Sequence, residues 1–171
     1  MECDACGSHS VTRRDIEGYL LFECQLCGEM FGDDEAIALI DELREGRARG
    51  LDDEVIPLVS VLESTQAFRL VHASIGWKEK GEAPSVLFTA VRSDTRDIER
   101  LMKSLELANR RTHHRWLVEL SLQQTLVFVL RPRFYKPPAD ITPGEIEQAR
   151  ADLGTVATQL RRDVSLSWWR A

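Results

Sequence analysis

The sequence predicts an α+β fold that begins with a small metal-binding hairpin, and two observations support this prediction. Residues 1–31 hold two near-identical turns, Cys3-Asp4-Ala5-Cys6-Gly7 and Cys24-Gln25-Leu26-Cys27-Gly28. From Leu51 onward, apolar residues recur with helical and strand periods in the order helix, two strands, helix, two strands, helix. Strand pairs in this order predict an antiparallel sheet, with the helices on one face or at its ends.

The composition is that of a globular protein, since 43% of the 171 residues are hydrophobic and 29% are charged. We expect a hairpin module over residues 1–32, a linking helix over 33–50 and an α+β domain over 51–171. No apolar run is long enough to span a membrane, and the first residues lack the pattern of a signal peptide. We therefore expect a cytoplasmic protein, in which paired CxxC turns bind metal more often than they form disulfides.

The two turns predict a metal site formed by Cys3, Cys6, Cys24 and Cys27. The glycine after each second cysteine allows the backbone angle that such a turn needs. Four thiolates in a tetrahedron suit zinc, and iron is the alternative because rubredoxin-like sites use the same turns. The CxxCG…CxxCG pattern resembles zinc ribbons as a class, over residues 3 to about 31. The resemblance implies a structural ion, since a closed four-cysteine shell leaves no position for a substrate.

The strands of this hairpin are expected at residues 11–14 and 19–22, with the reversal near Glu17-Gly18. So small a unit has too little core to fold alone, and metal binding is expected to supply the deficit. A helix is expected next, from Asp34 to about Gly46, with acids in its first turn. Its predicted apolar stripe consists of Ile37, Ile40 and Leu43.

The predicted α+β domain opens with a helix from Asp52 to about Ser64, and Pro57 near its start is able to shift the N-terminus. Strands are expected at residues 68–75 and 85–91. Asp94 is expected to cap the next helix, which is amphipathic. The apolar stripe of that helix is predicted to be Ile98, Leu101, Met102, Leu105 and Ala108.

Two further strands are expected at residues 115–122 and 125–130. The second is apolar on both faces, which predicts a place in the middle of the sheet. Thr142-Pro143-Gly144-Glu145 is a capping box with proline at the first helical position, so a final helix is expected from there to about Arg162. The tail, which contains Trp168 and Trp169, is expected to form an edge strand or a packed extension.

The order of elements after Leu51 resembles the type III secretion chaperone-like fold, a class of non-enzymatic protein-binding proteins. The resemblance is carried by Leu105–Arg110 at the end of a helix, then a strand pair, a proline-bearing loop and the capped final helix. The order also resembles the tRNA wybutosine methyltransferase family, in the opening helix and the strand at 69–76, but the Ser-Cys-Ser-Gly-Arg signature of that family is absent. The first resemblance implies a protein partner.

Charge is distributed unevenly along a chain whose net charge is −6. Residues 29–63 hold 11 acids and 3 bases, whereas residues 92–136 hold 10 bases and 5 acids. The candidate nucleic-acid contact is a basic set on and after the second predicted helix of the domain, formed by Arg96, Arg100, Lys103, Arg110 and Arg111. The alternative is an ordinary solvated helix face on which Glu99 and Glu106 pair with these bases.

Catalytic motifs are missing: the chain has no Gly-rich phosphate loop, HExxH, GxSxG or paired-carboxylate constellation. His113 and His114 are expected to be surface histidines. The leading hypothesis is a non-enzymatic adaptor or regulatory protein that binds a protein partner and holds structural zinc. One alternative is a regulator that binds RNA or DNA through the ribbon and the basic Arg92–Lys136 surface, with Trp77 or Phe134 stacking on bases. The other is an enzyme with the ribbon as a structural appendage. The sequence gives no indication of oligomeric state.

Overall fold

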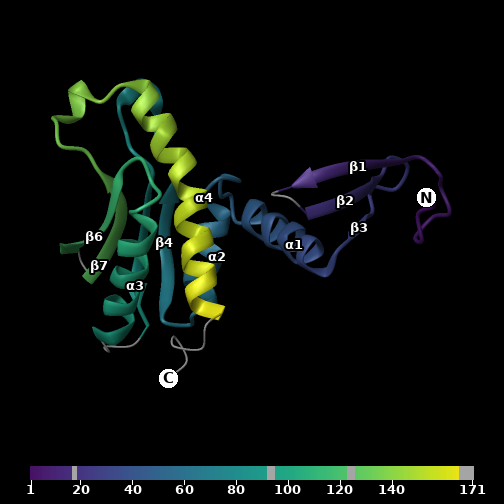
Figure 1. Cartoon of the computed structure of the whole chain (residues 1–171), viewed down its shortest axis with the longest axis horizontal. Helices are drawn as coiled ribbons and strands as arrows, with labels where there is room; N and C mark the ends of the chain where they lie inside the picture. The colour runs from purple at the N-terminus through teal and green to yellow at the C-terminus, as the bar shows by residue number, and fades with distance from the viewer. Residues whose placement is uncertain (17–18, 92–94, 123–125, 166–171) are drawn as a thin grey trace. The chain divides into compact units, whose positions relative to one another are not determined.

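The computed structural model describes residues 1–16, 19–91, 95–122 and 126–165. The chain forms two compact units, Met1–Glu45 and Gly46–Ala171, which are purple to blue and blue to yellow in Figure 1. Each unit has its own sheet, one with three strands and one with four. The α+β class predicted from the sequence is confirmed.

The first unit contains a three-stranded antiparallel sheet in the order β1-β2-β3. The strands are β1 (Val11–Ile16), β2 (Tyr19–Cys24) and β3 (Met30–Gly32). The sequence did not predict β3, which is only three residues long, and the predicted reversal at 17–18 lies outside the described residues. Phe22 and Phe31 are register partners with rings stacked 5.7 Å apart, so β3 closes the sheet beside the second cysteine turn.

Helix α1 (Asp34–Ala48) follows the sheet and packs against it. Its buried side chains differ from the predicted stripe: Ile40 is buried as expected, but Ile37 is 37% exposed. Ala36 and Leu39 are buried instead, and Ala36 and Ile40 form a small core with Leu21 of β2. The buried face is therefore turned toward the small Ala36, which lets the helix approach the sheet closely.

The second unit is built on a four-stranded antiparallel sheet in the order β4-β5-β7-β6. The strands are β4 (Phe68–Ser74), β5 (Ser85–Ala90), β6 (Arg115–Leu122) and β7 (Leu126–Arg133). The predicted central place of β7 is confirmed, because it pairs with both β5 and β6. Short 3-10 helices follow β4 (η1, Lys78–Lys80) and β7 (η2, Pro138–Asp140).

Three helices, α2 (Ile56–Ser64), α3 (Thr95–Ala108) and α4 (Pro143–Ser165), cover one face of this sheet. Figure 1 shows α4 running beside α2, and it also contacts α3. All three helices and one face of the sheet contribute side chains to one core. The largest fully buried side chains in this core include Leu58, Phe88, Leu101, Trp116, Leu130, Leu153 and Leu160. The element order α-β-β-α-β-β-α is therefore the one predicted.

Two helices depart in detail from their predictions. Helix α2 begins at Ile56 rather than Asp52, because Pro57 fits only the first helical turn. On α3, Met102 is 55% exposed although it was predicted to lie in the apolar stripe, and Ser104 is buried in its place. The core-facing side of α3 is thus rotated away from Met102, which matters for the surface described below.

The capping box at the start of α4 is confirmed. The Thr142 backbone N–H donates to Glu145 Oε2 at 2.9 Å, and the Glu145 N–H donates to Thr142 Oγ1 at 3.3 Å. Lys136 Nζ also donates to Glu145 Oε2, at 2.5 Å. This hydrogen bond, followed by those from Thr142, lowers the pKa of Glu145 to about 2. Helix α4 continues to Ser165, beyond the predicted end at Arg162, so the first two residues of the predicted tail are helical. The rest of the tail, with Trp168 and Trp169, lies outside the described residues.

Candidate metal centre and binding surfaces

The two cysteine turns of the first unit have the same backbone hydrogen bonds. In the first turn the Gly7 N–H donates to Cys3 O at 2.7 Å, and the Cys3 N–H donates to Ser8 O at 2.9 Å. In the second turn the Gly28 N–H donates to Cys24 O at 2.8 Å, and the Cys24 N–H donates to Glu29 O at 2.8 Å. Gly7 and Gly28 have φ angles of 71° and 73°, in the left-handed region that favours glycine. The glycines are therefore required by the turns.

The four cysteine sulfurs form a cluster of the size that a metal ion needs. The Sγ atoms of Cys3 and Cys27 lie 3.6 Å apart, as do those of Cys6 and Cys24. All four sulfurs lie within 4.8 Å of one another. A tetrahedral zinc ion with Zn–S bonds of about 2.3 Å holds its sulfurs about 3.8 Å apart. The donor set and its spacing therefore fit a four-thiolate metal site, which the sequence predicted at these four residues.

Backbone groups of the second turn favour the thiolate of Cys24, whereas the neighbouring cysteine side chains help to raise the pKa of Cys6 and Cys27. The Cys27 N–H lowers the pKa of the Cys24 thiol to about 6, and the Leu26 N–H acts in the same direction against the burial of the sulfur. Cys3 and Cys24 are buried, whereas Cys6 and Cys27 are exposed. Four sulfurs complete a tetrahedral shell, so a metal held here supplies structure rather than an open coordination position. Zinc and iron both suit this set of donors.

The basic residues predicted to contact nucleic acid lie on α3 and the turn after it. Arg96, Lys103, Arg110 and Arg111 are exposed. Arg100 is half-buried, and its Nη1 lies 3.3 Å from Oδ1 of Asp97. Whether the set acts on nucleic acid stays a prediction. The structure shows four exposed cations along one helix and its C-terminal turn.

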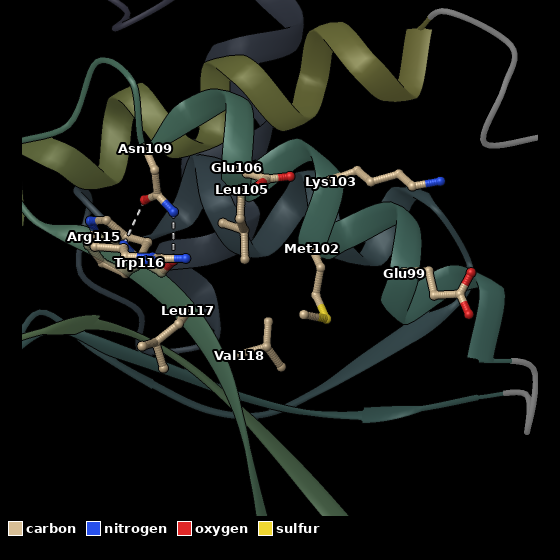
Figure 2. Close-up of a pocket in the computed structure, with 10 residues that line it drawn as sticks. All are labelled: Glu99, Met102, Lys103, Leu105, Glu106, Asn109, Arg115, Trp116, Leu117 and Val118. Carbon is tan, nitrogen blue, oxygen red and sulfur yellow. Dashed lines mark hydrogen bonds between the residues drawn. The ribbon is translucent and has the colours of Figure 1, made fainter.

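A groove of about 440 Å³ runs between α3 and β6 (Figure 2). In Figure 2, Met102 extends from α3 toward Val118 on β6, and Leu105 points from the same helix into the space beside them. Charged side chains of both signs also line the groove: Glu99, Lys103, Glu106 and Arg115. The sequence missed this groove because Met102 has the spacing of a core residue.

Asn109 lies at one end of the groove, and its side-chain amide makes the two backbone hydrogen bonds that a neighbouring strand would otherwise make to β6. Its Nδ2 donates to Trp116 O at 2.9 Å, and its Oδ1 accepts the Trp116 N–H at 2.7 Å (Figure 2). The side chain thus satisfies both outward backbone groups of Trp116 on β6. The Trp116 indole Nε1 is buried and has no acceptor among the described residues.

A second side-chain cluster joins α4 to the turn before β6, and the sequence did not predict it. Asp152 is 2% exposed and accepts the backbone N–H groups of His113 and His114 at 2.8 and 2.9 Å. The Nδ1 atoms of the two rings lie 3.0 and 3.4 Å from the same carboxylate. The side chain of His113 is 61% exposed, as predicted for a surface histidine, but that of His114 is only 12% exposed. No local pattern reveals this cluster, since Asp152 lies 38 and 39 residues from its partners.

Comparison of the chain with protein-family models, with curated proteins and with solved structures gives no match. The likeness of the first unit to a zinc ribbon therefore rests on its cysteine spacing and sulfur geometry. Across the described part of the chain, none of the helices combines the length and apolar character needed to cross a membrane.

Proposed function

We propose that this protein is a non-enzymatic binding module in which the zinc-ribbon-like unit is structural and the second unit receives an extended segment of a protein partner. The segment adds to the outer edge of β6 and places side chains in the groove under α3. The observation that carries this proposal is the pairing of Asn109 with Trp116, which marks where the free edge of β6 begins.

The hydrogen-bonding direction of β6 follows from this pairing. Trp116 lies opposite Pro132 on β7, and proline has no N–H to donate. Hydrogen-bonded and non-hydrogen-bonded pairs alternate along an antiparallel ladder, so Val118 and Leu120 are also non-hydrogen-bonded partners of β7. Their N–H and C=O groups therefore point away from β7. In the part of the chain that the structure describes, no strand pairs with this edge.

The groove supplies the specificity that backbone pairing lacks. Addition of a strand to a sheet edge gains affinity from main-chain hydrogen bonds and specificity from pockets for alternate side chains. Met102, 55% exposed, and Leu120, 59% exposed, are the apolar groups that a partner would cover. The rim charges of both signs favour a partner segment with polar residues flanking an apolar anchor.

Site-specific photo-crosslinking from two positions on α3 tests the proposal. Met102 lines the groove, whereas Leu107 is on the same helix, is 39% exposed and does not line it. A photo-reactive residue at position 102 is expected to cross-link one defined partner in cells, and the same residue at 107 is not. With that partner purified, Met102→Glu is expected to weaken binding about tenfold or more, and Leu107→Glu to leave it unchanged.

Amide hydrogen exchange then distinguishes strand addition from other binding modes. In the free protein, the amides of Val118 and Leu120 should exchange faster than those of Leu117 and Glu119, which face β7. The partner is expected to slow exchange at Val118 and Leu120. If the amides of Val118 and Leu120 exchange as fast in the complex as in the free protein, the partner does not add to β6 and the proposal fails.

Nucleic-acid binding is the second candidate, and the exposed cations Arg96, Lys103, Arg110 and Arg111 are the observation that favours it. Against it, Lys103 lies one helical turn from both Glu99 and Glu106, which weakens the local positive field. Binding of mixed RNA or DNA with a steep salt dependence, lost in an Arg110→Glu/Arg111→Glu variant, would establish this function. Binding that is absent at low salt would remove it.

A further inference from the structure

Two arginines lie side by side at the end of the sheet of the second unit. Arg115 and Arg133 are register partners on β6 and β7, so their side chains leave the same face. Both are exposed, and within the described ranges neither forms an ion pair. Like charges directly opposite each other destabilise a strand pair. An anion held between the two guanidinium groups would remove this repulsion.

The two arginines line a hollow of about 280 Å³. Lys136 lines the same hollow, but its charge is neutralised by an ion pair. Lys136 and Glu145 both line it and form an ion pair with Nζ and Oε2 2.5 Å apart. The pKa of Glu145 is lowered to about 2, so its carboxylate stays ionised opposite Lys136 at neutral pH. The unbalanced charge of the hollow is therefore the pair of arginines.

His113 and His114 also line the hollow, and the Asp152 cluster fixes their positions. Asp152 accepts the backbone N–H groups of His113 and His114, and both imidazoles direct Nδ1 toward its carboxylate. The ring of His114 also packs on Phe134, with centroids 4.8 Å apart. The two histidines are thus held by a buried carboxylate, and His114 also by an aromatic contact.

An exposed aromatic ring, that of Tyr135, lies next to the guanidinium group of Arg133. Tyr135 is 75% exposed, lines the same hollow, and lies with its ring centroid 4.9 Å from Cζ of Arg133. A guanidinium fork next to a flat ring suits a ligand that joins a phosphate to a planar group. Nucleotides have this combination of chemistry.

We propose that Arg115 and Arg133 form a binding site for the phosphate group of a nucleotide, with Tyr135 as the surface for its base. Each guanidinium donates two parallel hydrogen bonds to phosphate oxygens. The site shares Arg115 with the groove between α3 and β6, but Arg133 does not line that groove. Arg115 lines both hollows, so Arg133 is the residue whose substitution separates the two proposals.

The test uses the full zinc-loaded chain with inorganic phosphate and with AMP, followed by calorimetry and by amide NMR shifts. Wild-type protein is expected to bind AMP more tightly than inorganic phosphate, with the shifts centred on residues 113–115 and 133–136. Arg133→Gln is expected to lose at least tenfold in affinity for both. The matched control is Arg131→Gln, two residues earlier on the same face of β7, where the native arginine pairs with Glu119. That variant is expected to bind as the wild type does.

Thermal unfolding gives a second readout that needs no ligand. In low-salt buffer without phosphate, Arg133→Gln is expected to raise the Tm of the second unit because it removes the repulsion from Arg115, whereas Arg131→Gln is not. Phosphate is expected to raise the Tm of the wild type but not of Arg133→Gln. Absence of AMP binding to the wild type, or equal losses in the Arg131 and Arg133 variants, would overturn the site. Equal affinity for AMP and inorganic phosphate would overturn the nucleotide as its ligand.

Discussion

The two units of this protein are stabilised in different ways. The second unit buries a continuous core in which eighteen of the described residues, most of them on three helices and one sheet face, are at most 5% exposed. Among the described residues of the first unit, the core consists of Leu21, Ala36 and Ile40, with Met30 packed against it. In place of further apolar side chains, it gathers four cysteine sulfurs within 4.8 Å. A unit of this size needs such a replacement, because its apolar burial alone does not offset the entropy of ordering the chain.

The units also differ in charge. The first unit has 12 acids against 3 bases, a balance of −9, whereas the second has 19 bases against 16 acids, a balance of +3. Four thiolates around a divalent ion add two further negative charges to the first unit. A metal ion bound by these thiolates would therefore have to stabilise the first unit against the repulsion among its own negative charges.

Removal of the metal is expected to have the largest effect and to divide the units most sharply. Binding of structural zinc contributes apparent free energies of roughly 10–16 kcal/mol in small modules. Cys24→Ser, or a chelator, is therefore expected to unfold the first unit and to leave the second folded. NMR spectra would then lose the signals of residues 1–45 and keep those of the second unit. A single cooperative unfolding of the whole chain would contradict this separation.

A cavity made by mutation in the core of the second unit is expected to destabilise that unit and to leave the metal site of the first unit intact. Leu130 on β7 is fully buried, and replacement of a buried leucine by alanine costs about 2–5 kcal/mol. Leu130→Ala is expected to lower the free energy of unfolding of the second unit in urea by that amount. The absorption of cobalt bound in place of zinc should stay the same through the second unit's transition. Loss of the cobalt signal together with that unfolding would mean that the units depend on each other.

The difference between the units also explains what the sequence was able to predict. The metal site depends on two turns with the same local pattern, so Cys3, Cys6, Cys24 and Cys27 are recognisable without the fold. The start of α4 is equally local, because Thr142 and Glu145 satisfy each other within one turn. The binding surfaces of the second unit depend on distant pairings instead. Asp152 meets His113 across 39 residues, and no pattern of neighbouring residues encodes that contact.

Met102 shows why the groove in particular was missed. Its helical spacing places it with Leu101 and Leu105, so periodicity alone assigns it to the core. Helix α3 lies over β6, which is the edge strand of the sheet. Met102 therefore lies outside the part of the helix that the sheet covers, and it is 55% exposed. Periodicity predicts that a helix has an apolar face, but tertiary packing decides how much of that face is covered.

The cap of α4 gives a smaller effect, which depends on pH and is confined to the second unit. The pKa of Glu145 is lowered in the folded state from 4.5 to about 2 by Lys136 and then Thr142. The stabilisation is therefore present above pH 4.5 and is lost as the pH falls toward 2. Glu145→Gln is expected to flatten the dependence of unfolding free energy on pH in this window.

Thr142→Ala removes the same cap at neutral pH and is expected to cost about 0.5–2 kcal/mol. Asp140→Asn is the control for Glu145→Gln, since Asp140 is an exposed acid close to the same helix start. Urea titrations at several pH values measure both effects. An unchanged pH slope in Glu145→Gln would show that another carboxylate controls acid unfolding.

The smallest expected effect comes from two helical glycines that respond in opposite directions. Gly154 on α4 is exposed and has open space where a Cβ would be, so Gly154→Ala is expected to raise the free energy of unfolding of the second unit by about 0.5–1 kcal/mol. At Gly46, near the end of α1, a Cβ would lie 2.4 Å from Cγ1 of Ile56. Gly46→Ala is therefore expected to destabilise the second unit despite the better helix propensity of alanine. Equal and favourable changes at both positions would mean that the close approach of Gly46 to α2 is not a constraint on the fold.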